Sequence, residues 1–178
     1  RTVTTVDHGK LDLKALTLYA ILLAAGFVLN LTVSKFFSGL TGGFLSPEFI
    51  IAAFCLEILI IKPNIGQAAV IGLLAGVVIQ ITASVKGPDL IAEPVAAVVM
   101  ALLVSAFAES KAKGLLPLVG TFVVTFISGI IYAVIFTFLI MKNPAFVGVM
   151  APVVAATGVA NAIIVAALHL PIKKALKL

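Results

Sequence analysis

Charged side chains interrupt the apolar runs of this 178-residue chain at only a few places, and the most prominent lies near its middle. Residues 86–94 carry Lys86, Asp89 and Glu93 between two apolar runs. A further carboxylate, Glu48, stands at the start of an earlier apolar run. An amino-acid ligand needs an anion for its ammonium and donors for its carboxylate, and these residue types can supply both. We therefore expect them to line a site for a small molecule.

Other residues extend this predicted site. Asn161 lies inside the last apolar run, where an amide is costly unless it has a partner. Residues 35–47 form a segment rich in Gly, Ser and Phe, and its aromatic side chains could stack on an aromatic ligand. The full set of predicted substrate-binding residues is Phe36, Phe37, Phe44, Glu48, Lys86, Asp89, Glu93 and Asn161.

The same carboxylates also have a purely structural interpretation. Glu48 and Glu93 both stand near predicted helix starts, where a carboxylate can cap free N–H groups and is favoured by the helix dipole. Glu57 lies nine residues after Glu48, hence ~13 Å further along a helix. We expect Glu57 to pair with Lys62 or to contact a partner protein.

Several kinds of chemistry have no support in the sequence. The chain has no Gly-x-x-x-x-Gly-Lys-Ser/Thr phosphate loop. Its two histidines, His8 and His169, have no partner at metal-ligand spacing, and we expect His169 to contact carbonyls where the last helix ends. The single cysteine, Cys55, lies in an apolar run and is expected to be a buried side chain. We therefore expect no enzyme activity, no cofactor and no metal.

The composition indicates a membrane protein. Hydrophobic residues make up 62% of the chain and charged residues 11%, whereas soluble domains carry roughly 25% charged residues. A transmembrane helix needs ~20 mostly apolar residues. The apolar runs therefore predict one all-α membrane domain over residues 1–178, a six-helix bundle. The predicted spans are residues 13–34, 44–61, 65–85, 90–108, 115–141 and 145–170.

The distribution of basic residues predicts an orientation. With six spans, both termini share one side, which then carries Arg1, Lys10, Lys14, Lys62, Lys111, Lys113, Lys173, Lys174 and Lys177. The opposite side carries Lys35, Lys86 and Lys142. Because Lys and Arg are enriched in cytoplasmic loops, both termini are expected in the cytoplasm and residues 86–94 outside. The net charge of +5 is explained in this way, and nucleic acid is not an expected partner.

Small residues mark one face of the first predicted span. Ala20 and Ala24 are four residues apart, so they share a helix face that another helix backbone could approach closely. Packing within the bundle and contact with a partner protein both remain open from this spacing alone.

Several short segments, in this order, resemble the substrate-binding S components of energy-coupling factor transporters, in particular the tryptophan type. They span most of the chain and are Ala20-x-x-x-Ala24, Gly43-Phe44-Leu45-Ser46-Pro47-Glu48, Ile61-Lys62-Pro63, Gly87-Pro88-Asp89-Leu90-Ile91-Ala92-Glu93-Pro94-Val95, Gly120-Thr121 with Ser128-Gly129, and Asn161. The long segment is similar to the family's Pro-Asn-(Ile/Met)-Ile-x-Lys-Pro-Val. It departs from that pattern at Asp89, where the family often has Asn, and at Glu93, where it often has Lys.

The resemblance implies an integral protein of the prokaryotic cell membrane that binds its substrate, here tryptophan or a related aromatic compound, near the outer face. It implies two cytoplasmic ATPases and a transmembrane coupling protein as partners, with Ala20 and Ala24 facing the coupling protein. The implied mechanism is toppling of the whole subunit in the membrane. Alternatives are an S component for a vitamin or other small molecule, a self-contained channel or secondary carrier, and a scaffold without a ligand.

Overall fold

The computed structural model describes residues 11–176, and within that range the chain is all helical, without a strand. The predictions for Arg1, His8, Lys10 and Lys177 concern positions outside the described residues. The main helices are α1 (Leu13–Leu29), α2 (Lys35–Leu40), α3 (Phe49–Ile61), α4 (Ile65–Ile79), α5 (Asp89–Ala106), α6 (Thr121–Ile135) and α7 (Phe146–Ala175). Shorter turns extend them: π-helical Asn30–Ser34, Leu116–Gly120 and Phe136–Ile140, and 3₁₀-helical Lys111–Leu115.

Four continuous helical stretches are long and apolar enough to cross a membrane, which is compatible with a multi-pass membrane protein. They are Leu13–Leu40, Asp89–Ala106, Lys111–Ile140 and Phe146–Ala175. The other two apolar helices, α3 and α4, have 13 and 15 residues, fewer than the ~20 that cross the hydrocarbon core. Large apolar side chains remain exposed on the long helices, for example Leu13 (80%) and Leu139 (71%). A lipid environment accounts for such exposure on helices that also have a buried side.

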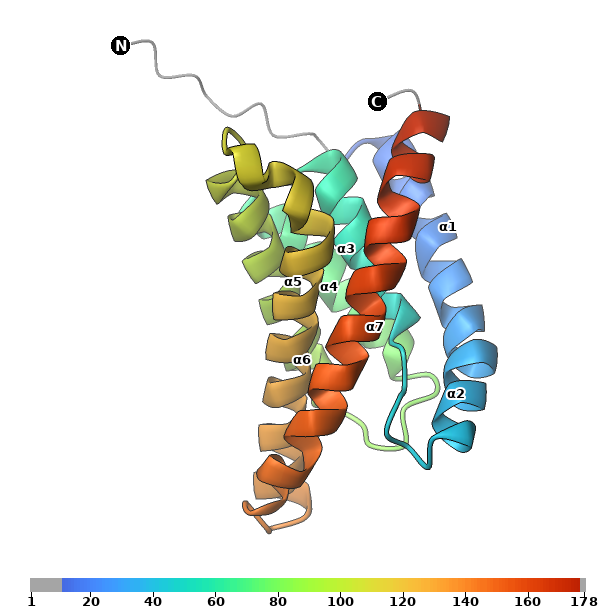
Figure 1. Ribbon diagram of the computed structural model, residues 1–178, viewed down its shortest axis with the longest axis vertical. Helices are drawn as coiled ribbons and strands as arrows, with labels where there is room; N and C mark the ends of the chain where they lie inside the picture. The colour runs from blue at the N-terminus through green and yellow to red at the C-terminus, as the bar shows by residue number, and fades with distance from the viewer. Residues whose placement is uncertain (1–10, 177–178) are drawn as a thin grey trace.

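The centre of the bundle is α3, which packs against α1, α4, α5, α6 and α7. Apart from Glu57 its residues are apolar, and ten of them, Glu57 included, are buried, as expected for a helix surrounded by others. The first turn of α1 and the last turn of α7 lie at the same end of the bundle, at the top of Figure 1. The connections between α2 and α3 and between α4 and α5 lie toward the other end.

Two glycines bring α4 and α5 into backbone contact. A methyl group on Gly72 would lie 2.5 Å from the Glu93 carbonyl oxygen and 2.7 Å from Pro94 Cα. A methyl group on Gly76 would lie 2.7 Å from the Asp89 carbonyl oxygen. Small residues one turn apart allow such close helix approach in membranes. This contact fixes the part of α5 that carries the carboxylates.

The first helix is longer than the sequence predicted. The predicted spans leave residues 35–43 as a connection, but the helix continues through a π-helical turn into α2 and ends at Leu40. Phe36 and Phe37 are therefore helical, and Phe44 belongs to the connection instead of extending the next helix. The error arose because Gly and Ser were interpreted as loop signals, although two of the serines turn toward a polar cavity described below.

The prolines also proved to be weaker helix boundaries than expected. Most of residues 86–94 is helical, because α5 begins at Asp89 and contains Pro94. Likewise α7 continues through Pro171 to Ala175, so His169 lies within the helix and not at its end. Proline is tolerated in membrane helices where neighbouring groups pack against it, as Gly72 does at Pro94. The third predicted span, in contrast, ends early, at Ile79.

Candidate functional site

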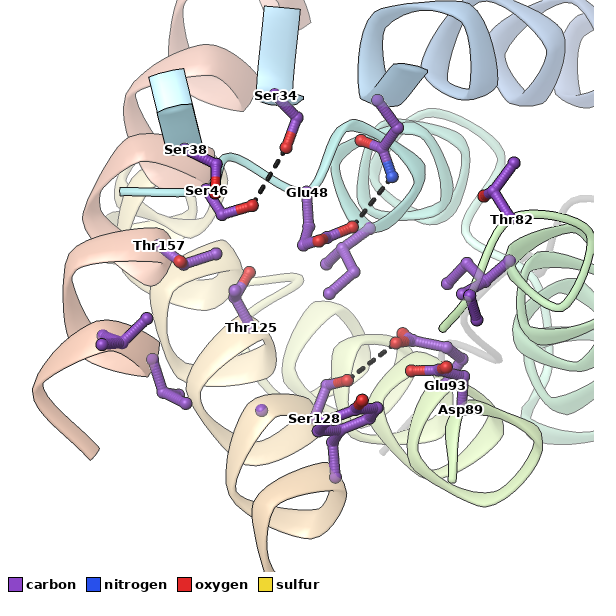
Figure 2. Close-up of a pocket in the computed structure, with 18 of the residues that line it drawn as sticks. Ser34, Ser38, Ser46, Glu48, Thr82, Asp89, Glu93, Thr125, Ser128 and Thr157 are labelled. Atoms are coloured by element: carbon purple, nitrogen blue, oxygen red, sulfur yellow. Dashed lines mark hydrogen bonds between the residues drawn. The ribbon is translucent and has the colours of Figure 1, made fainter. Parts of the chain in front are cut away.

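A cavity of about 360 Å³ opens between the helices at the end of the bundle remote from the first turn of α1. Its walls come from five parts of the chain: Asn30–Ser38, Ser46–Ile51, Ile79–Glu93, Thr125–Tyr132 and Met150–Thr157. Polar side chains concentrate around it (Figure 2), in a bundle that is otherwise apolar. The size matches that of small-molecule sites in proteins.

Three of the predicted ligand-binding residues line this cavity, and all three are carboxylates: Glu48, Asp89 and Glu93. Figure 2 shows Glu48 on one wall and the other two on the facing wall. Asp89 and Glu93 are one helical turn apart in α5, and both are buried. The lysine among the lining residues is Lys35. The lining therefore carries more formal negative than positive charge.

Two asparagines hold the start of α3 and, with it, Glu48. Asn30 donates from Nδ2 to Glu48 Oε2 at 2.9 Å, and its Oδ1 accepts from the Phe49 N–H at 2.7 Å. Asn161 Oδ1 accepts from the Glu48 N–H at 2.9 Å, while its Nδ2 donates to Thr125 Oγ1 at 3.3 Å. These amides satisfy two of the free N–H groups at the helix start, those of Glu48 and Phe49. The Glu48 side chain itself does not cap α3, contrary to the structural alternative.

Glu93 lies in the second turn of α5 and is not a cap. Ser128 Oγ donates to Glu93 Oε1 at 2.9 Å, which connects α5 to α6. The second oxygen, Oε2, is buried and has no hydrogen-bond partner among the described residues. The residue as a whole is 2% exposed. One face of this carboxylate is therefore held by the protein, and the other is free for a donor.

Hydroxyl groups that the sequence analysis missed complete the walls. They are contributed by Ser34, Ser38, Ser46, Thr82, Ser84, Thr125, Ser128, Tyr132 and Thr157. Ser34 and Ser46 are within hydrogen-bond distance, at 3.1 Å, and thereby connect the first helix to the segment before α3. Ser34 and Ser38 are four residues apart, so a helix through residue 40 would have put them on one face. That signal was lost when this segment was predicted to be a loop.

The other predicted ligand-binding residues lie elsewhere. Phe36, Phe37 and Phe44 are 61%, 38% and 54% exposed and are not among the lining residues. Lys86 is exposed and its ammonium donates to the Gln80 carbonyl oxygen. Asn161 supports the cavity from behind, through Glu48 and Thr125, without lining it.

Four further residues with sequence-based predictions lie outside the cavity lining. Ala20 and Ala24 are exposed on α1, outside the cavity. Glu57 is completely buried, and neither carboxylate oxygen has a hydrogen-bond partner among the described residues. Lys62 is exposed beyond the end of α3, so the expected Glu57–Lys62 pair is not formed.

Within residues 11–176, no group of three His, Cys, Asp or Glu side chains is arranged to hold a metal.

The three carboxylates of the cavity can accept hydrogen bonds, and its hydroxyls can both donate and accept them. Such walls suit a polar ligand with donor groups. Binding of such a ligand is the chemistry that these carboxylates and hydroxyls support. No model of a known protein family, no curated protein and no solved structure matches this chain.

Proposed function

We propose that this chain is the substrate-binding subunit of a membrane importer of the energy-coupling factor type. The observation that carries the proposal is the polar cavity, with Glu48, Asp89 and Glu93 in its walls, at one end of an apolar helical bundle. Carboxylates buried among apolar helices carry a cost in free energy. In membrane proteins such residues generally mark a ligand or ion site.

In the proposed arrangement the bundle crosses the membrane six times. The short helix α3 crosses as an inner segment, since neighbouring helices cover it. The other short helix, α4, exposes Val70 and Val77 and faces the lipid together with the long helices. The excess of Lys and Arg at one end keeps both termini in the cytoplasm, and the cavity then opens toward the outer face.

The energy for import comes from other subunits in this proposal, namely a coupling protein and two cytoplasmic ATPases. Ala20 and Ala24 support a docking surface for the coupling protein, because both are exposed on α1 instead of packing within the bundle. Small residues on an exposed membrane helix permit a second helix to approach closely.

The class is tested by affinity isolation. The tagged chain is co-expressed with the coupling protein and ATPases of its source organism, and we expect all three partners to co-purify. Ala24→Leu should reduce their recovery, whereas Ala167→Leu, at an exposed alanine of α7, should not. No recovery of partners with the wild-type chain, together with substrate flux into liposomes that contain this chain alone, would favour a channel or secondary carrier instead.

Tryptophan is the first substrate to test, since its ammonium can meet the carboxylates of the cavity. The chain contains no Trp, so indole emission reports the ligand alone. We expect a saturable, environment-shifted emission when tryptophan is titrated into the purified protein. A signal that follows free tryptophan alone would remove tryptophan as substrate and leave the transporter class to the isolation experiment.

A further inference from the structure

We propose that the cavity selects an organic cation, a ligand with an ammonium or related nitrogen and no compensating carboxylate, and that Glu93 is the residue that receives its charge. The inference rests on the ligand site of the proposed function and specifies its substrate class. The inference is that the cavity prefers a net-positive ligand over a zwitterion such as tryptophan. The residue types alone do not distinguish these two classes of ligand.

The first argument is the charge of the walls. Glu48, Asp89 and Glu93 line the cavity, and Lys35 is the lysine that joins them. Asp89 and Glu93 lie one turn apart on the wall that faces Glu48 (Figure 2). Ionised carboxylates brought together in a membrane bundle repel one another, and a bound cation relieves that repulsion. A ligand carboxylate would instead add another negative charge to the same space.

The second argument is the free oxygen of Glu93. Ser128 satisfies Oε1, but Oε2 is buried without a partner among residues 11–176. The Glu93 side chain lies in the cavity wall, where Figure 2 shows its carboxylate beside that of Asp89. Leaving a buried acceptor without a hydrogen bond is unfavourable. A charged N–H donor of a ligand would supply that bond, and a charge-assisted bond is stronger than one between neutral groups.

Several donors that a substrate carboxylate could use already bond to protein groups. Both polar atoms of the Asn161 amide are bonded within the protein, to Glu48 and Thr125. Those of Asn30 are bonded to Glu48 and Phe49. Lys86 donates to a carbonyl outside the cavity. Among the lining residues, Lys35, the second N–H of the Asn30 amide and the hydroxyls are left as donors. Lys35 is the charged one, and the amide and hydroxyls suit neutral polar groups equally well.

The test uses ligands that share one frame and differ in charge. Tryptamine, tryptophan and indole-3-propionate are cationic, zwitterionic and anionic, and each is titrated by indole emission against the Trp-free protein. We expect tryptamine to bind at least about tenfold more tightly than tryptophan, because both carry the ammonium but only tryptophan brings a carboxylate next to the carboxylates of the walls. Indole-3-propionate should bind more weakly than either. Butylamine, 4-aminobutyrate and butyrate repeat the comparison without the ring, with thermal stabilisation as the readout.

A matched pair of variants assigns the charge to Glu93. Glu93→Gln keeps the shape and an acceptor for Ser128 but removes the charge, and it should weaken tryptamine binding at least about tenfold. Glu109→Gln makes the same exchange at an exposed site outside the lining and should leave binding unchanged. Equal binding by Glu93→Gln and wild type would overturn the role of Glu93.

Two results would overturn the cation proposal as a whole. One is tighter binding of tryptophan than of tryptamine. The other is that neither tryptamine nor butylamine binds. Neither result affects the proposed transporter class, because co-purification of the coupling protein and ATPases does not depend on which ligand the cavity prefers.

Discussion

Replacing Gly72 by alanine should disturb the bundle at the point where α4 supports the carboxylate-bearing turns of α5. The added methyl group would lie 2.5 Å from the Glu93 carbonyl oxygen, 2.7 Å from Ala97 Cβ and 2.7 Å from Pro94 Cα. All three atoms belong to the backbone or to its first side-chain carbon, so no rotamer change can make room. The two helices must separate, and Glu93 moves with α5.

The size of the effect follows from two opposing terms. In a helix, Gly→Ala by itself stabilises by about 1 kcal/mol. Forcing an extra methyl group into a close-packed site costs about 1–3 kcal/mol or more, and backbone contacts belong at the upper end of that range. The net destabilisation is therefore about 2 kcal/mol, which lowers the thermal midpoint of a chain of this length by about 4–8 °C.

The single cysteine makes the measurement simple. Cys55 is completely buried in α3, so a thiol-reactive fluorogenic maleimide labels it only when the bundle opens. Labelling against temperature in detergent gives the midpoint for each variant. Gly148→Ala is the matched control, because a methyl group there meets no atom within 4 Å, and its midpoint should equal or exceed that of the wild type.

A Gly72→Ala midpoint at or above that of the wild type would refute the close contact between α4 and α5. A lower midpoint for Gly148→Ala as well would mean that both glycines act through local helix conformation and not through packing. The packing argument further requires that Gly72→Ala weakens ligand binding, since the displaced backbone carries Glu93.

Two further predictions concern other parts of the bundle. Glu57→Leu should raise the thermal midpoint, because it removes a buried carboxyl group without a hydrogen-bond partner in the described chain, a defect that costs about 1–3 kcal/mol; a lower midpoint by circular dichroism would mean that Glu57 has a partner. Asn64→Ala should lower the midpoint, because Asn64 and Gln67 form a reciprocal cap at the start of α4 worth about 1 kcal/mol, and Asn64→Ser should retain most of that stability.

The helical class and the approximate position of each helix could be predicted from the sequence. Long apolar runs separated by short polar connections can satisfy their backbone hydrogen bonds in few ways other than as helices. Each continuous helical stretch overlaps a predicted span. The boundaries were less predictable. Gly, Ser and Pro interrupt helices in water, but residues 35–40 and Pro94 remain helical here. Their neighbours in the bundle, which the sequence does not reveal, decide these cases.

The composition of the cavity was decided largely by tertiary structure. The sequence identified the carboxylates Glu48, Asp89 and Glu93, because charge in an apolar chain is conspicuous wherever it occurs. Serine and threonine are common in membrane helices and carry no such signal, so the hydroxyl walls went unnoticed. The phenylalanines were expected in the site because their rings could stack on a ligand. Phe36 and Phe37 instead lie on an exposed face of α2 and Phe44 in an exposed connection, and none of the three lines the cavity.

Which groups meet also depends on distances along the chain that no local pattern encodes. Asn161 holds the Glu48 N–H across 113 residues, and Ser128 holds Glu93 across 35. Composition and apolar runs determine that this chain forms long apolar helices with charged ends. Helix packing, through contacts such as those of Gly72 with α5, determines which ends come together, which donors are used up within the protein, and which carboxylate oxygen is left for a ligand.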